Sequence, residues 1–418
     1  MNFKLLALIL LTLTFIYKLF MSLRERKSFA NPIPANVSDI YDETTYAKWR
    51  AYSAEKSKWE IVSTACSFIL TFVLLITNAY AGFARLFNSD VYVQALSVVL
   101  LSVITDGVFG AVFGYIDAMI VEQKYGFNRT TIKTFIADQI KNVIISFIIM
   151  TGITFLLAAL HMWLKDYLAL AFALAMFVFV MLVSFLFPFF SKIFNKFTPL
   201  EDGELKDKLC TLLTKNGYSV RKIQVVDASR RSSKSNAYFT GFGKTKTIVL
   251  YDTLVSSSTP DEICAVFAHE MGHGLHRDTL KNQILSFINI AVIALCAFFT
   301  VKYPAIYVDF GFDAVNYGFA LLLVATIEME IIAPLFSLFT SWRSRKAEYR
   351  ADARAVSEGY GKELISALKK LAKENFAHLA PDELIVKLTY SHPTLSQRIT
   401  AIEAGMKDES GRKPDSEA

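Results

Sequence analysis

The stretch His269-Glu270-Met271-Gly272-His273 restricts the fold and chemistry of this chain more than any other part of its sequence. A spacing of four residues places two side chains one turn apart on the same face of an α-helix, so both imidazoles can reach one metal ion. Glu270 follows the first histidine, where its carboxylate can take a proton from a water that the metal activates. The pattern His-Glu-x-x-His is typical of zinc proteases, and it predicts one Zn²⁺ per chain.

The residues before this motif carry a helix start signal. Thr259 can act as the N-cap, Pro260 suits the first helical position, and Asp261 places a negative charge in the first turn. Glu262 can complete a capping box with Thr259. Apolar residues then recur at helical spacing, which predicts a helix that ends near residues 276–278.

The composition indicates a membrane protein rather than a soluble globule. The chain has 418 residues, of which 53% are hydrophobic and only 20% charged, and its mean hydropathy is +0.37. A bilayer core of about 30 Å needs about 20 apolar helical residues. Seven runs meet this length: Phe3–Phe20, Ile61–Ala84, Val91–Ile120, Ile140–Leu164, Tyr167–Phe190, Ile284–Val301 and Tyr317–Thr340. The first is expected to be a retained anchor rather than a signal peptide, because no clear small-residue cleavage site follows it.

The positive charges between these runs predict the orientation of the chain. The N-terminal side carries Lys4, Arg85, Lys165 and Lys302, whereas the first loop on the opposite side alone carries seven Lys and Arg residues. The positive-inside rule makes that opposite side cytosolic, and it also holds the metal motif. We therefore expect a multi-pass integral membrane protein with its active site toward the cytosol, in the inner membrane of a bacterium or the endoplasmic reticulum of a eukaryote. The net charge of +6 follows from this topology, and no nucleic-acid partner is expected.

The chain divides into five predicted regions. Residues 1–190 form membrane helices 1 to 5 with cytosolic loops, and residues 191–282 form a catalytic region with a small sheet and the motif helix. Residues 283–340 form membrane helices 6 and 7, residues 341–406 a C-terminal catalytic region, and residues 407–418 a disordered tail. The fold class is therefore mainly α, a polytopic membrane protein with seven long transmembrane helices and a small zincin-like α+β catalytic domain.

Three short segments before the motif helix predict this sheet. Lys222–Asp227, Asn236–Phe242 and Thr247–Tyr251 alternate or run apolar with β-branched and aromatic residues. An extended substrate can pair with an edge strand of such a sheet. The four cysteines form no Cys-x-x-Cys pair, so we expect free thiols that do not bind the metal.

The third metal ligand is expected beyond the last membrane run. Glu348 and Asp352 lie four residues apart on one face of a charged helical segment. Glu348 can complete a His₂Glu site, and Asp352 can accept the outer N–H of a ligating histidine. His276 is the alternative ligand, although a histidine at that position more often caps a helix end or lies on the surface.

A turn that opens a helix near the C-terminus supplies two further candidates. His392 and Arg398 can donate hydrogen bonds to a substrate carbonyl or to a developing oxyanion. Spacing alone gives this assignment little support.

Together, these motifs resemble the type I CAAX prenyl endopeptidases, which are integral-membrane zinc metalloproteases. The resemblance covers nearly the whole chain in the order Lys124–Arg129, Phe194–Leu200, Ser235–Tyr238, Leu250–Leu254, His269–His273, Glu348–Asp352 and His392-Pro393. Gly274-Leu275 stands where eukaryotic members often have Trp-Lys, and the loop 302–316 is short, which indicates a microbial homologue.

The resemblance implies a fold and a set of roles. It implies zinc held by His269, His273 and Glu348, with Glu270 as the general base. Substrate main-chain contacts are then expected from Asn236, His392 and Arg398. Seven long helices are expected to enclose a chamber that the metal site closes at its cytosolic end. The implied partners are the lipid bilayer and a peptide or protein substrate that can carry an isoprenyl group at its CaaX-type C-terminus.

Two other functions remain open from the sequence. The first is a membrane-protein quality-control metallopeptidase without prenyl specificity, although its shorter relatives have fewer membrane spans. The second is a seven-helix receptor or transporter in which the metal motif arose by chance. Charged residues are scarce inside the apolar runs, which disfavours an ion path.

Overall fold

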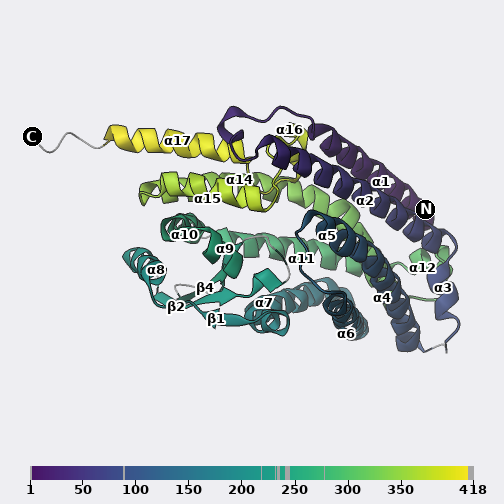
Figure 1. Ribbon diagram of the computed structural model, residues 1–418. Helices are drawn as coiled ribbons and strands as arrows, with labels where there is room; N and C mark the ends of the chain where they lie inside the picture. The colour runs from purple at the N-terminus through teal and green to yellow at the C-terminus, as the bar shows by residue number, and fades with distance from the viewer. Residues whose placement is uncertain are drawn as a thin grey trace, which may run out of the picture.

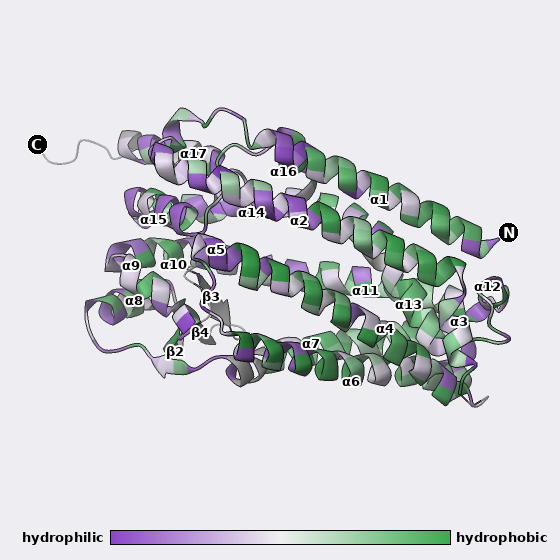
Figure 2. Ribbon diagram, turned by 45° about the vertical axis from the view of Figure 1, so that its right-hand side comes forward, coloured by the Kyte–Doolittle hydropathy of each residue, from purple (hydrophilic) through white to green (hydrophobic). Residues whose placement is uncertain are grey.

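The computed structural model describes residues 2–87, 90–217, 219–230, 232, 236–240, 245–276 and 278–412. Long helices run side by side along the molecule (Figure 1). Their apolar segments lie toward the end that carries the N-terminus, whereas hydrophilic residues gather at the end that carries the C-terminus (Figure 2). The molecule therefore has a membrane half and a polar half.

The membrane half is built from helices long enough to cross a bilayer. They are α1 (Phe3–Ser28), α2 (Glu43–Ile76), α4 (Val91–Tyr115), α6 (Ile132–Leu164), α7 (Leu168–Phe194), α11 (Asp278–Lys302) and α13 (Tyr317–Ile327) with its continuation. Length and composition give six candidate membrane stretches in the described chain, whereas the sequence predicted seven. The counts differ because one stretch, Ile132–Leu186, contains both α6 and α7, which are separated only by the short turn η3 (Lys165–Tyr167).

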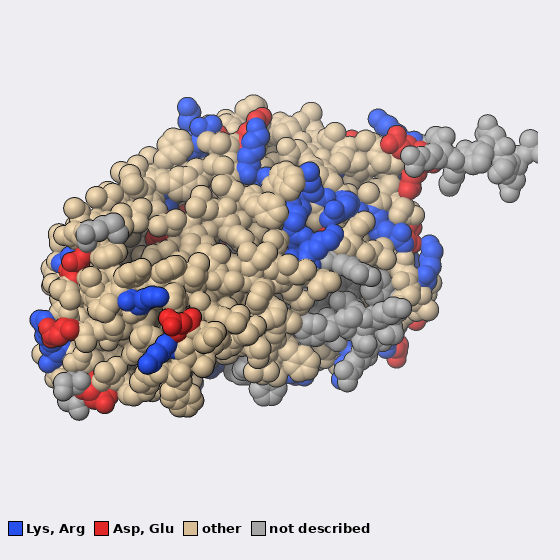
Figure 3. Space-filling model, turned by 180° about the vertical axis from the view of Figure 1, so that it is seen from behind, with Lys and Arg blue, Asp and Glu red and all other residues tan. Residues whose placement is uncertain are grey.

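The outer faces of these helices are apolar. Leu13, Ile16 and Ile148 are each more than half exposed, as expected for side chains that face lipid. From behind, charged residues gather toward the two ends of the molecule, with a broad uncharged surface between them (Figure 3). Short segments join the helices at these ends: η1 (Ala35–Val37), α3 (Ala79–Ala84), η2 (Ile116–Glu122), α5 (Gln123–Tyr125) and α12 (Ala305–Asp309).

The last membrane helix continues into the polar half. α13 passes through the π-helical segment η5 (Glu328–Ile332) into α14 (Ala333–Ser357) without a break. Glu348 was predicted in a charged helical segment that follows the final crossing. It lies in α14, which continues the last membrane helix, so its position depends directly on the membrane half.

A four-stranded sheet lies beside the metal-motif helix, in the order β1-β2-β4-β3. β1 (Phe197–Pro199) and β3 (Ala237–Thr240) are its antiparallel edges, and β2 (Ser219–Val226) and β4 (Thr245–Tyr251) pair in parallel between them. The three predicted strands are present with shifted ends, and residues 241 and 242 of one prediction lie outside the described residues. β1 was not predicted, because three residues are too few to show alternation.

The motif helix α10 (Pro260–Leu275) packs against α14, α8 (Glu204–Lys215) and α15 (Gly361–Glu374). The other helices of the polar half are η4 (Ala228–Arg230), α9 (Asp252–Ser257), α16 (Glu383–Thr389) and α17 (Leu395–Arg412), of which α16 and α17 pack against α14. The predicted tail begins too early, because α17 remains helical through residues 407–412. Residues 413–418 of that tail lie outside the described residues.

Candidate metal centre

α10 forms as its sequence predicts. The side chain of Thr259 accepts from the N–H of Glu262 at 3.3 Å, and the carboxylate of Glu262 accepts from the N–H of Thr259 at 2.8 Å. This capping box satisfies two N–H groups that the first turn leaves free. Ile263, Phe267 and Met271 are buried on one side, which leaves the two motif histidines on the other.

A close approach of α10 to α14 brings Glu348, the predicted third ligand, to these histidines. A Cβ atom at Gly272 would lie 2.6 Å from the Cα of Ala351 and 3.1 Å from its Cβ. Only glycine therefore allows this approach, which is a packing reason for the residue between Met271 and His273.

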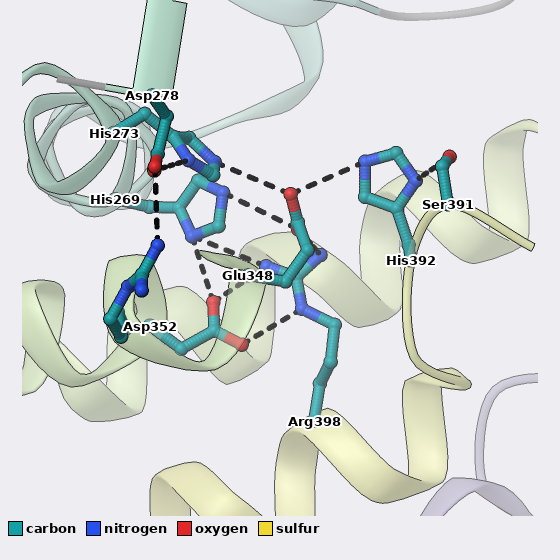
Figure 4. Close-up of polar contacts among 9 residues, drawn as sticks. His269, His273, Asp278, Glu348, Asp352, Ser391, His392 and Arg398 are labelled. Atoms are coloured by element: carbon teal, nitrogen blue, oxygen red, sulfur yellow. Dashed lines mark hydrogen bonds and ion pairs between the residues drawn. The ribbon is translucent and has the colours of Figure 1, made fainter. Parts of the chain in front are cut away.

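Three side chains converge from the two helices. His269, His273 and Glu348 each offer a ligand atom, and these atoms lie within 4.8 Å of one another. His269 Nε2 lies 3.6 Å from Glu348 Oε2, and His273 Nε2 lies 3.3 Å from Glu348 Oε1 (Figure 4). Ligand atoms at about 2.0–2.1 Å from a tetrahedral zinc ion lie about 3.4 Å apart, so these separations fit such an ion.

The hydrogen bonding of Glu348 also fits a metal ligand. Its side chain is only 5% exposed, and Oε2 is buried without a hydrogen-bond partner among the described residues. A buried carboxylate oxygen that lacks such a partner is costly unless a cation compensates it. Among the described residues, the guanidinium of Arg398 is the cation near this oxygen, with Nη1 at 3.3 Å.

Carboxylates hold the outer nitrogens of both histidines. His269 Nδ1 donates to Asp352 Oδ1 at 2.8 Å, as the sequence analysis expected. His273 Nδ1 donates to Asp278 Oδ2 at 3.2 Å, a contact that the sequence analysis did not identify. Each hydrogen bond selects the tautomer with a free Nε2 and aims that atom at the metal position. Asp278 lies five residues beyond His273, at the start of α11. This short separation was the one feature of the sequence that could have indicated a contact between the two side chains.

The electrostatics around His273 favour positive charge at the metal position. Burial by itself would lower the pKa of His273, but hydrogen bonds and charge from Glu348 and Asp278 raise it to about 9. A proton and a metal ion compete for the same Nε2 atom. The surrounding carboxylates therefore favour a positive charge at His273, which either a proton or a metal ion can supply.

Arg398 pairs with two carboxylates of the candidate site, Asp352 and Glu348. Its Nε and Nη2 donate to the two oxygens of Asp352 at 2.9 and 2.6 Å, and its side chain is 11% exposed. The substrate contact predicted for Arg398 stays a prediction. The structure gives its guanidinium a bidentate carboxylate partner.

His392 and Asn236 lie in more open positions. His392 is 60% exposed, with Nε2 3.5 Å from Glu348 Oε1 and Nδ1 2.9 Å from the hydroxyl of Ser391. Asn236 precedes β3, and its side chain accepts from the N–H of Ala237 at 2.8 Å. His392 therefore borders the metal position, whereas the described contacts do not connect Asn236 with it. Glu270 is half-buried between the histidines on α10.

The fold and this site together define a membrane metalloprotease, and the comparisons with known proteins agree. Residues 22–196 match the profile of the CAAX prenyl protease N-terminal region with five membrane helices, and residues 199–405 match peptidase family M48. The chain belongs to the CAAX prenyl protease family of M48 peptidases.

Relatives match over nearly their full lengths. The Arabidopsis thaliana CAAX prenyl protease 1 homolog is 32% identical, with 93% of this chain and 95% of the relative aligned. CAAX prenyl protease 1 of Saccharomyces cerevisiae is 31% identical, with 93% of this chain and 91% of the relative aligned. The crystal structure of S. mikatae Ste24p superposes with a TM-score of 0.89 at 30% identity, covering 96% of this chain and 99% of that one.

Proposed function

We propose that this metalloprotease binds one zinc ion through His269, His273 and Glu348 and cleaves peptides of the C-terminal CaaX type, including prenylated ones. The convergence of two imidazole Nε2 atoms and one buried carboxylate supports the zinc assignment. The names of the relatives, CAAX prenyl protease 1, support the substrate class.

The proposed mechanism assigns a role to each polar group. Bound zinc supplies Lewis acidity, which acidifies a water and polarises the scissile carbonyl. Glu270 accepts the proton of the attacking water and returns it to the leaving amine, a role that its position between the histidines allows. His392 borders the same position from the open side and donates to the developing oxyanion. Asp352, Asp278 and Arg398 keep the ligands oriented.

The decisive experiment compares products from two peptides with the same C-terminal sequence, one prenylated and one not, by mass spectrometry. We expect cleavage of the prenylated peptide by the zinc-loaded wild type, and none by a Glu270→Gln variant that still contains one zinc per chain. Near-normal turnover by a clean Glu270→Gln preparation would contradict the assignment. Preferred cleavage of unprenylated membrane proteins would instead favour the quality-control function.

We also propose that the polar half faces the cytosol. The support is the excess of Lys and Arg in the loops that join the membrane helices at that end. A peptide tag added after Ala418 and examined in sealed inside-out vesicles tests this orientation. The tag should be digested by added protease without detergent, and protection until detergent is added would reverse the assignment.

A further inference from the structure

A cavity lies between α1, α2 and the segment 376–390. None of the three proposed metal ligands lines it. Its volume is about 470 Å³, enough for a small organic group. Five aromatic side chains contribute to its walls: Phe29, Trp49, Tyr52, Phe376 and Tyr390. Trp49 is only 1% exposed and packs edge-on against Phe29, with ring centroids 5.7 Å apart, so these rings are held in place.

Two carboxylates also line this aromatic cavity. Glu25 Oε1 accepts from His378 Nδ1 at 3.2 Å and from the hydroxyl of Tyr390 at 3.3 Å. Glu25 Oε2 is buried and has no hydrogen-bond partner among the described residues. Glu60 lies close enough to Glu25 for the two charges to repel, and no ion pair of Glu60 occurs within the described part of the chain.

The one Lys or Arg among the lining residues compensates these charges only in part. Lys56 attracts Glu60, but it also pairs with Glu122 at 2.8 Å and with Asp117 at 3.2 Å. Neither of these partners lines the cavity. The walls therefore carry an excess of negative charge beside aromatic rings.

We propose that this cavity binds an alkylammonium group, either the head group of a zwitterionic phospholipid or a soluble amine of the choline type. Aromatic faces attract such a cation through their quadrupoles, and a nearby carboxylate strengthens that attraction. Anionic ligands are disfavoured by Glu25 and Glu60. The volume suits a trimethylammonium or primary ammonium group with its short linker.

Tyr390, which lines the cavity, is also connected to the candidate metal centre. The backbone carbonyl of Tyr390 accepts from Arg345 Nη1 at 2.6 Å, and Arg345 lies on α14 one turn before Glu348. His392, which borders the metal position, follows Tyr390 by two residues. A ligand that packs against Tyr390 therefore contacts the segment that positions His392.

The binding test uses the full-length, zinc-loaded protein in a maltoside detergent, which carries no ammonium group. Calorimetric titration with choline chloride should show saturable binding at one site per chain, whereas sodium chloride at the same ionic strength should not. Glu60→Gln should weaken choline binding roughly tenfold or more. Glu383→Gln is the matched control, because Glu383 is 90% exposed outside the cavity, and it should bind as the wild type does.

Two results would overturn this proposal. One is a choline titration that cannot be distinguished from the sodium chloride titration, and the other is unchanged affinity in a folded Glu60→Gln protein. If Glu60→Gln does not fold, Glu25→Gln serves as the second variant with the same expectation.

Native mass spectrometry then separates the two sources of the ammonium group. Retention of phosphatidylcholine or phosphatidylethanolamine over phosphatidylglycerol by the wild type, reduced in Glu60→Gln, supports a lipid ligand. Binding of free choline without such retention supports a soluble amine. The absence of both would contradict the site.

Discussion

His273 Nδ1 donates to Asp278 Oδ2 at 3.2 Å, across the junction between α10 and α11. The side chain of Asp278 is only 7% exposed, and its other oxygen accepts from Arg350 Nη2 on α14 at 3.1 Å. One carboxylate thus connects the metal-motif helix, the helix that re-enters the membrane and the helix that carries Glu348. The orientation of His273 depends on this connection.

Replacing Asp278 by Asn should weaken zinc binding. The amide keeps the size of the side chain but removes the negative charge that supports the Nδ1–H of His273, so we expect zinc affinity to fall roughly 10- to 100-fold. Competition with a chelator measures this affinity. Asp261→Asn is the control, because Asp261 lies on α10, the helix that carries His273, pairs with Lys208 and is half exposed. Equal zinc affinity in the two variants would contradict the role of Asp278.

Replacing Gly272 by Ala should separate α10 from α14. The added Cβ would lie 2.6 Å from the backbone Cα of Ala351, which cannot rotate away. Overpacking of this kind costs about 1–3 kcal/mol of stability. The expected result is a lower unfolding temperature together with weaker zinc binding. Gly152→Ala has open space around the added methyl and should lower neither quantity.

Arg398 and His392 should respond differently to substitution, although the sequence suggested the same role for both. Arg398→Lys removes a bidentate pair with Asp352, so zinc affinity should fall while the enzyme that still holds zinc keeps much of its turnover. His392→Gln should leave zinc affinity unchanged and lower kcat, by up to about 100-fold for a lost oxyanion donor. Zinc titration and kcat at saturating zinc separate the two effects. A fall in kcat alone in Arg398→Lys would support substrate contact instead.

The sequence predicted the parts of the structure whose signals are local. Thr259 and Glu262 indicated the start of α10, and the spacing of His269 and His273 indicated a shared metal. Long apolar runs indicated the membrane helices, because a bilayer requires a minimum helical length. Each of these signals depends only on residues within one helix.

The sequence was less informative where two elements meet. Asp278 belongs to α11, and only the three-dimensional return of that helix shows that it reaches His273. The pairing of Arg398 with Asp352 was not predicted, because nothing near Arg398 in the sequence shows that its guanidinium meets a carboxylate on another helix. The helical structure of residues 407–412 at the end of α17 was also not predicted. A segment rich in charged residues is typical of a disordered tail, but such residues are equally common on exposed helices.

Glu262 should stabilise the protein in a pH-dependent way. Although its burial would raise the pKa, Lys370, Ser366 and the N–H of Thr259 lower it by contacts to the charged form. The pKa of Glu262 is therefore lower in the folded protein than in the unfolded protein, where it is about 4.3. The stabilisation is complete above about pH 4.3 and is lost as the pH falls through the pKa of the folded protein. Glu262→Gln retains a capping side chain but loses the ion pair, so near neutral pH it should be about 1–2 kcal/mol less stable.

The pH dependence distinguishes this charge effect from the loss of the cap. The difference in unfolding temperature between wild type and Glu262→Gln should shrink as the pH is lowered below about 4, where Glu262 itself becomes protonated. Thr259→Ala removes the N-cap hydroxyl and should destabilise by about 1 kcal/mol at every pH. Thermal unfolding of the three proteins between neutral pH and pH 3 makes the comparison. A difference between wild type and Glu262→Gln that persists unchanged at pH 3 would show that the charge of Glu262 is not its source.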